Sequence, residues 1–251
     1  MKDYFSGQAA GYARFRPQYP DALYQFILSK TKANDLAWDC GTGNGQTARE
    51  LAKHFKAVYA TDISEKQIAQ AYQSDNITYA VEPAEKTNLL NETVDLVSVS
   101  QALHWFDVKA FYAEVKRVCK PGGLLAVWTY QLLQVDQEFD QQVDHFYTNT
   151  LGKYWDDARK HVDDGYQSIY FPFKQIETPA FFIEVKWSLA DVKGLLKTWS
   201  AVQKFIAENG YDPVDYFIRL QKNNWQPGEV KTVRFPVSLK MAYVNEVLQV
   251  F

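Results

Sequence analysis

The sequence predicts an α/β fold built on a largely parallel β-sheet. From Leu36 to Tyr130, short apolar runs alternate with helix-like patterns, which is the order of strand–helix units. A glycine-rich turn directly follows the first apolar run, and an acidic residue ends the second. The chain has 251 residues, of which 47% are hydrophobic. That is enough for one well-buried domain with an elaboration, and too little for two full domains.

The elements of the first half follow from periodicity and from helix-boundary signals. A first helix is predicted over Asp21–Thr31, with Leu23, Phe26 and Ile27 on one face. Ser64 and Gln67 form a capping-box pattern at the start of a further helix. Strands are predicted at 36–40, 57–62, 77–81, 94–100 and 124–129, and the other helices after the glycine turn, from 64 to 73 and from 107 to 119.

The alternation of strand and helix patterns ends after Tyr130. Apolar residues from Val135 to Tyr147 recur at helical spacing, and a polar, aromatic stretch follows. A strand is predicted at 181–187, helices at 189–207 and 213–223, and extended chain at 230–244. Within that extended chain, Pro236 predicts a bulge, an edge position or a break. We expect helical cap elements over the ligand face of the sheet between residues 131 and 175.

Composition and charge narrow the class of protein. The formal net charge of −3 and the pI of about 5.8 give no electrostatic reason to bind a phosphate backbone, so nucleic acid is not the expected partner. Cys40 and Cys119 form neither a disulfide framework nor a metal site, which fits a reducing compartment. The N-terminus carries no signal-peptide pattern, and no apolar stretch is long enough to span a bilayer. We therefore expect a cytoplasmic protein without a metal or a membrane partner.

The strongest chemical signal is the turn Asp39-Cys-Gly-Thr-Gly-Asn-Gly45, between a predicted strand and a predicted helix. Glycines permit a tight turn and a close approach of backbone N–H groups to a ligand, although an ordinary turn could also carry them. A dinucleotide fingerprint would place its third glycine at Gln46. Gly41, Gly43 and Gly45 therefore favour a ligand that lacks a pyrophosphate.

Two further positions lie at the ends of predicted strands. Asp62 ends the second strand, where a carboxylate can accept hydrogen bonds from both hydroxyls of a ribose. Gln101 and His104 follow the fourth strand, at the edge where open α/β sheets bind ligands. His104 is either a base or orienting group near pH 7 or a structural histidine, and Gln101 either contacts a ligand or is a plain loop amide. Trp105 is expected to pack the wall of a cleft.

These signals occur in one order along the chain and together resemble a known family. The sequence is similar to class I S-adenosylmethionine-dependent methyltransferases of the type 11 group, and within it to small-molecule methyltransferases like trans-aconitate methyltransferase. The resemblance implies a Rossmann-like, doubly wound, mostly parallel seven-stranded sheet with helical cap elements in the C-terminal half. The segments that carry it are Asp39–Gly45, Asp62, Pro83-Ala-Glu85, Gln101-Ala-Leu-His-Trp105, Arg117-Val-Cys-Lys-Pro-Gly-Gly123 and, near the start, Arg16-Pro-Gln-Tyr-Pro20.

The resemblance also implies the cofactor, S-adenosyl-L-methionine, and the residues that hold it. The turn at Gly41, Gly43 and Gly45 would cradle the methionine portion, with Asp39 near its ammonium. Asp62 would hold the ribose, while Ile63, Ala84 and Glu85 would surround the adenine, and Pro83 leaves the adenine contacts less defined because it lacks an N–H. Gln101 would face the methionine portion, His104 would be catalytic, and Phe5, Tyr12 and Arg16 would fold over the cofactor. Residues 1–130 would form the cofactor-binding core of a single domain, 131–175 a cap insertion, and 176–251 the rest of the sheet.

The sequence leaves the acceptor and several alternatives open. A carboxylate acceptor would need only a clamp, for which Arg16, Arg159 and Arg234 are possible, whereas a hydroxyl would benefit from a base. A nicotinamide-dependent oxidoreductase is a less favoured alternative, although Tyr112 and Lys116 have the spacing of a hydride-transfer pair. A cofactor-binding regulatory protein without turnover is the other. The expected partner is a small-molecule substrate, and the protein is expected to be a monomer or a homodimer.

Overall fold

The computed structural model describes residues 15, 17–222, 224–226 and 228–244 and divides into two compact units. The sheet unit comprises Asp21–Tyr130, His161–Phe181 and Val237–Phe251. The helical unit comprises Met1–Pro20, Gln131–Lys160 and Phe182–Pro236. No helix in the described part of the chain is both long and apolar enough to cross a membrane.

Seven strands form one sheet in the order β3-β2-β1-β4-β5-β7-β6, which confirms the predicted fold class. Strands β1 to β5 run parallel, and β7 pairs antiparallel with β5. The register sets Cys40 opposite Thr61 and Asp39 opposite Ser98, so β1, β2 and β4 end at the same edge. The strands are β1 (Leu36–Cys40), β2 (Ala57–Asp62), β3 (Ile77–Val81), β4 (Val94–Ser100), β5 (Cys119–Tyr130), β6 (Phe181–Ser188) and β7 (Val230–Tyr243).

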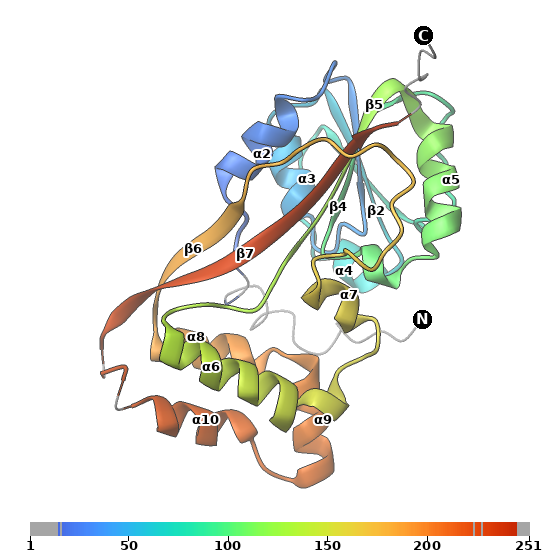
Figure 1. Ribbon diagram of the computed structural model, residues 1–251. Coiled ribbons are helices and arrows are strands. Elements are labelled where there is room, and N and C mark those ends of the chain that lie inside the picture. The colour runs from blue at the N-terminus through green and yellow to red at the C-terminus, as the bar shows by residue number, and fades with distance from the viewer. Residues whose placement is uncertain (1–14, 16, 223, 227, 245–251) are drawn as a thin grey trace. The chain divides into compact units, whose positions relative to one another are not determined.

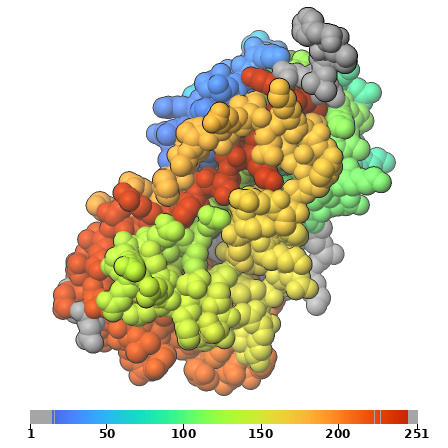
Figure 2. All heavy atoms as spheres, in the orientation of Figure 1, coloured from blue at the N-terminus to red at the C-terminus, as the bar shows by residue number. Residues whose placement is uncertain are grey.

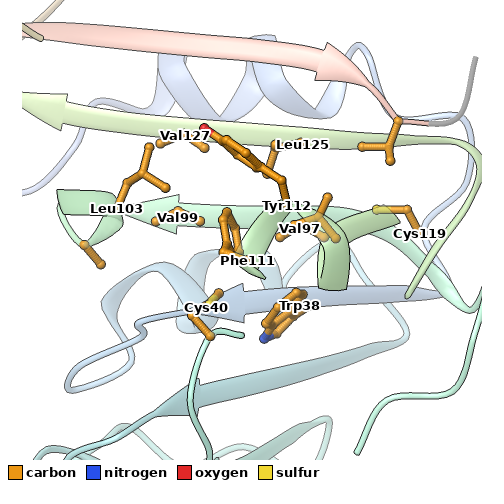
Figure 3. Close-up of a cluster of buried hydrophobic side chains, with 14 of the residues drawn as sticks. Trp38, Cys40, Val97, Val99, Leu103, Phe111, Tyr112, Cys119, Leu125 and Val127 are labelled. Atoms are coloured by element: carbon orange, nitrogen blue, oxygen red, sulfur yellow. The ribbon is translucent and has the colours of Figure 1, made fainter. Parts of the chain in front are cut away.

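Apolar side chains cover both faces of the sheet in the sheet unit. Phe111 and Val115 of α5 (Val108–Val118) pack with alternate residues of β4 and β5, such as Val97 and Val127, in a fully buried cluster (Figure 3). Such continuous apolar strands are typical of a parallel sheet buried on both sides. Figure 1 shows α2 (Asp21–Leu28) and α3 (Gln46–Leu51) on the opposite side of these strands from α5.

Several predicted elements end elsewhere than the pattern indicated. Helix α2 stops at Leu28, before the predicted end at Thr31, and it also buries Tyr24, which packs against Trp128, while Phe26 is half-buried against Phe181. Helix α4 (Glu65–Ile68) is one turn long because the chain then turns back, with the Tyr79 hydroxyl donating to the Tyr72 carbonyl at 2.7 Å. Ser64 nevertheless caps α4 as predicted, accepting from the N–H of Gln67.

Strand β5 is longer than its apolar run, and β7 continues through Pro236. β5 begins at Cys119, because the turn through Gly122 is itself paired: the Gly122 N–H donates to the carbonyl of Val244, and the Val244 N–H donates to that of Gly123. Pro236 lies inside β7, one residue before the ladder with β5 begins at Val237. Its missing N–H therefore removes no hydrogen bond from that ladder.

Aromatic rings form much of the core of the helical unit. Phe217 packs against Phe139 and stacks on Phe146, and Trp225 packs against Phe139. The predicted helix at 189–207 is two helices, because Trp199 adopts an extended conformation and the Thr198 hydroxyl bonds back to the Leu195 carbonyl. The helices of this unit are α6 (Gln137–His145), the π-helical η2 (Phe146–Thr150), η3 (Gly152–Tyr154), α8 (Leu189–Lys197), α9 (Ser200–Asn209) and α10 (Pro213–Gln221), and α7 (Arg159–Asp163) begins in it and ends in the sheet unit.

The segment from His161 to Phe181 belongs to the sheet unit, although the sequence pattern gave it no element of the sheet. It lies on the C-terminal part of β7 and is visible in gold at the surface in Figure 2. The Ile176 N–H donates to the carbonyl of Met241, and Lys240 Nζ donates to the carbonyl of Tyr166. This segment also carries Tyr166, whose hydroxyl meets His104 after β4.

The close packing of the cluster between α5 and the sheet predicts that removing one of its rings lowers the stability of the fold. We expect Phe111→Ala to lower the free energy of unfolding by about 3–5 kcal/mol, because the ring is fully buried and its loss leaves a void. Chemical denaturation measures this change. The control is Tyr170→Ala, since Tyr170 is 78% exposed and its loss should change the free energy by no more than about 0.5 kcal/mol. Equal effects of the two substitutions would contradict the packing.

Candidate functional site

The candidate site lies where β1, β2 and β4 end together at one edge of the sheet. Because β1 is hydrogen-bonded to both β2 and β4, the loops that follow these three strands emerge side by side. This is the edge at which open α/β sheets bind ligands. The loops carry the glycine turn, Asp62 and the segment from Gln101 to Asp107.

The glycine turn is left-handed at all three glycines and packed at two of them. The φ angles are +68° at Gly41, +56° at Gly43 and +80° at Gly45, values that favour glycine. A Cβ on Gly41 would lie 2.6 Å from the Cβ of Ala102, in the loop after β4, and one on Gly45 would lie 2.3 Å from the hydroxyl of Tyr79. No described atom lies within 4 Å of a Cβ placed on Gly43. The turn therefore packs at both ends and has open space at its centre.

Asp62 ties the glycine turn to the end of β2. One carboxylate oxygen accepts the N–H of Gly43 at 2.9 Å, and the other accepts the N–H of Ser64 at 2.8 Å. A carboxylate has about four acceptor positions, so two remain for a ligand. The neighbouring Ile63 is 49% exposed and offers an apolar surface beside these oxygens.

Asp39 is buried beneath the turn. Its carboxylate accepts the Thr42 hydroxyl at 2.6 Å and the Ser98 hydroxyl at 2.8 Å, and so connects β1, the turn and β4. Burial raises the pKa of Asp39 to about 6, although these hydroxyls and the backbone N–H of Ala48 favour the charged form. The structure thus gives Asp39 a bracing role that the motif did not specify, and its predicted place near a ligand ammonium stays a prediction.

The loop after β3 holds the residues expected at an adenine edge. The Ala84 side chain is buried in the cluster between α5 and the sheet. One oxygen of Glu85 accepts the N–H of Asp107 at 2.8 Å, and the Asp107 side chain caps the start of α5. Glu85 therefore links this loop to the loop that follows β4, while its second carboxylate oxygen has no hydrogen bond to a described residue.

Gln101 is held in a strained conformation at the end of β4. It has a φ of +56°, which is unusual for a residue with a side chain, and its N–H donates to the carbonyl of Trp128. Its side-chain oxygen accepts the Thr129 hydroxyl and the N–H of Tyr130. The NH₂ group has no hydrogen-bond partner among the described residues, so it is available to donate. Such backbone strain is typical of functional sites, which favours the ligand role over a plain loop amide.

His104 is paired with a residue that the sequence analysis missed. Its Nδ1 lies 3.0 Å from the hydroxyl of Tyr166, and its ring also contacts Trp105. Tyr166 comes from the segment His161–Phe181, more than 60 residues later in the chain. Gly165 signals a turn before Tyr166, but no spacing indicates that the phenol reaches His104.

Other residues singled out in the sequence have different surroundings. Phe5, Tyr12 and Arg16 lie outside the described residues. In the helical unit, Arg159 donates to the Tyr147 hydroxyl and lies over the Trp155 ring, whereas Arg234 forms an ion pair with Glu184 at 2.6 Å.

The side chains of both cysteines, Cys40 and Cys119, and of Tyr112 in α5 are buried. Burial raises the pKa of both free thiols, that of Cys119 to about 12, so neither is an activated nucleophile. Tyr112 is buried in the cluster, its pKa is also raised by burial, and its hydroxyl has no hydrogen-bond partner among the described residues. This setting does not fit a hydride-transfer pair of Tyr112 with Lys116, which instead lies over the Phe173 ring.

Comparisons with known proteins agree with this geometry. The family model described as "methyltransferase domain", of type 11, matches residues 38–127. A candidate methyltransferase of Dictyostelium discoideum is 35% identical over 94% of this chain and 92% of its own. A candidate S-adenosylmethionine-dependent methyltransferase of Saccharomyces cerevisiae is 25% identical over 62% of this chain and 58% of its own. The solved structure of a candidate type II methyltransferase from Anaeromyxobacter dehalogenans is 39% identical, covering 91% of this chain and 97% of its own, with a TM-score of 0.85.

The packing of the glycine turn predicts that an alanine destabilises the fold more at position 41 than at position 43. Gly41→Ala and Gly43→Ala both place a side chain at a positive φ, which costs about 1–2 kcal/mol. Only the alanine at position 41 would also overlap Ala102, which adds about 1–3 kcal/mol. Thermal and chemical denaturation should therefore find Gly41→Ala the less stable variant. Equal stability of the two variants would show that the turn is not packed on the loop after β4.

The buried carboxyl of Asp39 predicts a pH dependence of stability. Its pKa is about 6 in the folded chain against 3.8 for an aspartate carboxyl in water, so the folded chain binds more protons between these pH values. Its contribution to stability is therefore full below about pH 4 and is lost as the pH rises through 6, a change of about 3 kcal/mol. The measurement is the difference in unfolding free energy between the wild type and Asp39→Asn across this range. A difference that does not vary with pH would contradict the prediction.

Proposed function

The chain belongs to the class I S-adenosylmethionine-dependent methyltransferases of the type 11 group, and from this premise we propose that it methylates a small molecule at the edge formed by β1, β2 and β4. The observation that carries the proposal is the hydrogen bond from the Gly43 N–H to Asp62, which joins the glycine turn to the acid that ends β2. The two elements that a nucleoside-type ligand requires are thereby fixed to each other.

The residues present fit S-adenosylmethionine. The open space at Gly43 lets the backbone approach the methionine portion, and the NH₂ group of Gln101 is available to donate to it. The remaining acceptor positions of Asp62 suit two ribose hydroxyls, and the exposed side chain of Ile63 suits an adenine face. Ala84 and Glu85 would border the adenine edge. When bound, the cofactor supplies a methyl group already activated on a sulfonium.

The protein's own task is to orient the acceptor and exclude water. Transfer from a sulfonium is an in-line displacement, so the rate depends mainly on holding the acceptor atom in line with the methyl group. We assign this task to His104, which follows the fourth strand and is held by Tyr166. Trp105 contacts the His104 ring and would limit its movement.

We propose a carboxylate or a hydroxyl as the acceptor. The resemblance of the sequence to enzymes like trans-aconitate methyltransferase supports a small acid. A hydroxyl acceptor would have to lose its proton during or after transfer.

Isothermal titration calorimetry tests the proposal with an Asp62 variant and a matched control. The wild type should bind S-adenosylmethionine and its demethylated product, and should not bind NAD. Asp62→Ala should weaken both affinities by at least about 1–3 kcal/mol, because the ligand hydroxyls and two backbone N–H groups lose their acceptor. Asp75→Ala should leave them unchanged, since Asp75 is exposed. Selective binding of NAD, or equal affinities for wild type and Asp62→Ala, would overturn the proposed function.

A further inference from the structure

Tyr166 is held in an unusual conformation at the point where it meets His104. Its side chain is almost fully buried, with 1% exposed, yet its φ is +65°. Aromatic residues seldom adopt positive φ, and Gly165 before it has a φ of +64°. Glycine and asparagine adopt this conformation at a lower cost than tyrosine does. The strain therefore indicates that the tyrosine side chain itself is required at this position.

The backbone around Tyr166 is braced so that the strain persists. The Tyr166 N–H donates to the carbonyl of His161 at 2.7 Å, and the Tyr166 carbonyl accepts Lys240 Nζ from β7. The Asp164 carboxylate accepts the N–H groups of Gln167 and Ser168, each at 3.0 Å. These bonds fix the turn on both sides of Tyr166, so the phenol reaches His104 from a rigid support.

The hydrogen bond between Tyr166 and His104 has a preferred direction. A neutral imidazole carries its proton on one nitrogen and accepts on the other, and the partner of one nitrogen decides which form is present. A phenol has a pKa of about 10, so it is a stronger acid than the N–H of a neutral imidazole. In a bond between two groups that can each donate or accept, the stronger acid donates. The Tyr166 hydroxyl is therefore the donor and Nδ1 of His104 the acceptor.

We propose that Tyr166 is a positioning residue that holds the neutral His104 imidazole with its proton on Nε2. His104 then presents an N–H to the methyl acceptor instead of a lone pair. Its role is to orient an acceptor oxygen by donating a hydrogen bond to it, and not to remove a proton before transfer. This inference rests on the proposed function, and it assigns Tyr166 a place in the reaction that neither the motifs nor the comparisons gave it.

The same buried cluster offers a matched control. Tyr112 and Tyr166 both belong to the cluster between α5 and the sheet, and both are almost fully buried (Figure 3 shows Tyr112). The Tyr112 hydroxyl has no hydrogen-bond partner among the described residues, whereas that of Tyr166 meets His104. Tyr166→Phe and Tyr112→Phe therefore remove the same atom from similar surroundings, and only the first removes a bond to the histidine.

Long-range proton–nitrogen NMR of the isotope-labelled full chain tests the inference, with the demethylated cofactor product added. His104→Gln assigns the His104 signal among the four histidines. In the wild type and in Tyr112→Phe, the neutral His104 ring should give the pattern of a proton on Nε2. In Tyr166→Phe, this pattern should give way to a mixture of both neutral forms. A role confined to packing would leave the pattern unchanged, because the phenylalanine ring fills the same space.

The outcomes separate this inference from the function on which it rests. A wild-type His104 with its proton on Nδ1 overturns the inference, and so does a pattern that is identical in wild type and Tyr166→Phe. The wild-type spectrum alone decides if Tyr166→Phe does not fold. Calorimetry on the same wild-type sample measures binding of the added product. Binding together with the wrong imidazole form overturns only the role of Tyr166, whereas absence of binding overturns the proposed function.

Discussion

The contact between Gly41 and Ala102 is the constraint on which the candidate site depends. A hydrogen atom is all that fits between the two loops, since even a methyl group on Gly41 would lie within 2.6 Å of the Ala102 Cβ. The loop after β1 and the loop after β4 are therefore locked at one distance. The residues on either side of Ala102, including Gln101 before it and His104 after it, take their positions relative to the glycine turn from this contact.

Hydrogen bonds to acidic side chains also hold the loops at this edge of the sheet in place. Asp39 gathers the hydroxyls of Thr42 and Ser98 at the ends of two neighbouring strands, and Asp62 gathers backbone N–H groups from two loops. Glu85 does the same between the loop after β3 and the start of α5. Three acids, two in the last residues of β1 and β2 and one in the loop after β3, thus act as braces that preorganise the site. Such preorganisation reduces the ordering that binding must otherwise impose.

Much of the sheet could be predicted from the sequence, because its strands are apolar runs with clear boundaries. The strands at 36–40, 57–62, 77–81 and 94–100 begin and end where the pattern indicates. The ends of helices were less predictable, since the short α4 and the break at Trp199 depend on side-chain contacts with residues elsewhere in the fold or in the adjoining turn.

In the site, too, residues marked by a local sequence pattern could be predicted, whereas residues defined by contacts between distant parts of the chain could not. The glycine turn and Asp62 are local signals, and the structure brings them together by one hydrogen bond. Tyr166 could not be found in this way, because its role depends on a turn more than 60 residues from His104 and on a lysine of β7. The burial of Asp39 was likewise hidden, since only the pairing of β1 with β4 sets Ser98 beside it.

The two cysteines have a practical consequence for following the molecule in solution. Both thiols are free, fully enclosed by the core on β1 and β5, and kept protonated by their apolar surroundings. A thiol must be ionised and accessible to react. Alkylating reagents and oxidants therefore have access to neither sulfur until the central strands separate. The rate at which Cys40 and Cys119 are modified would thus report how often the sheet opens.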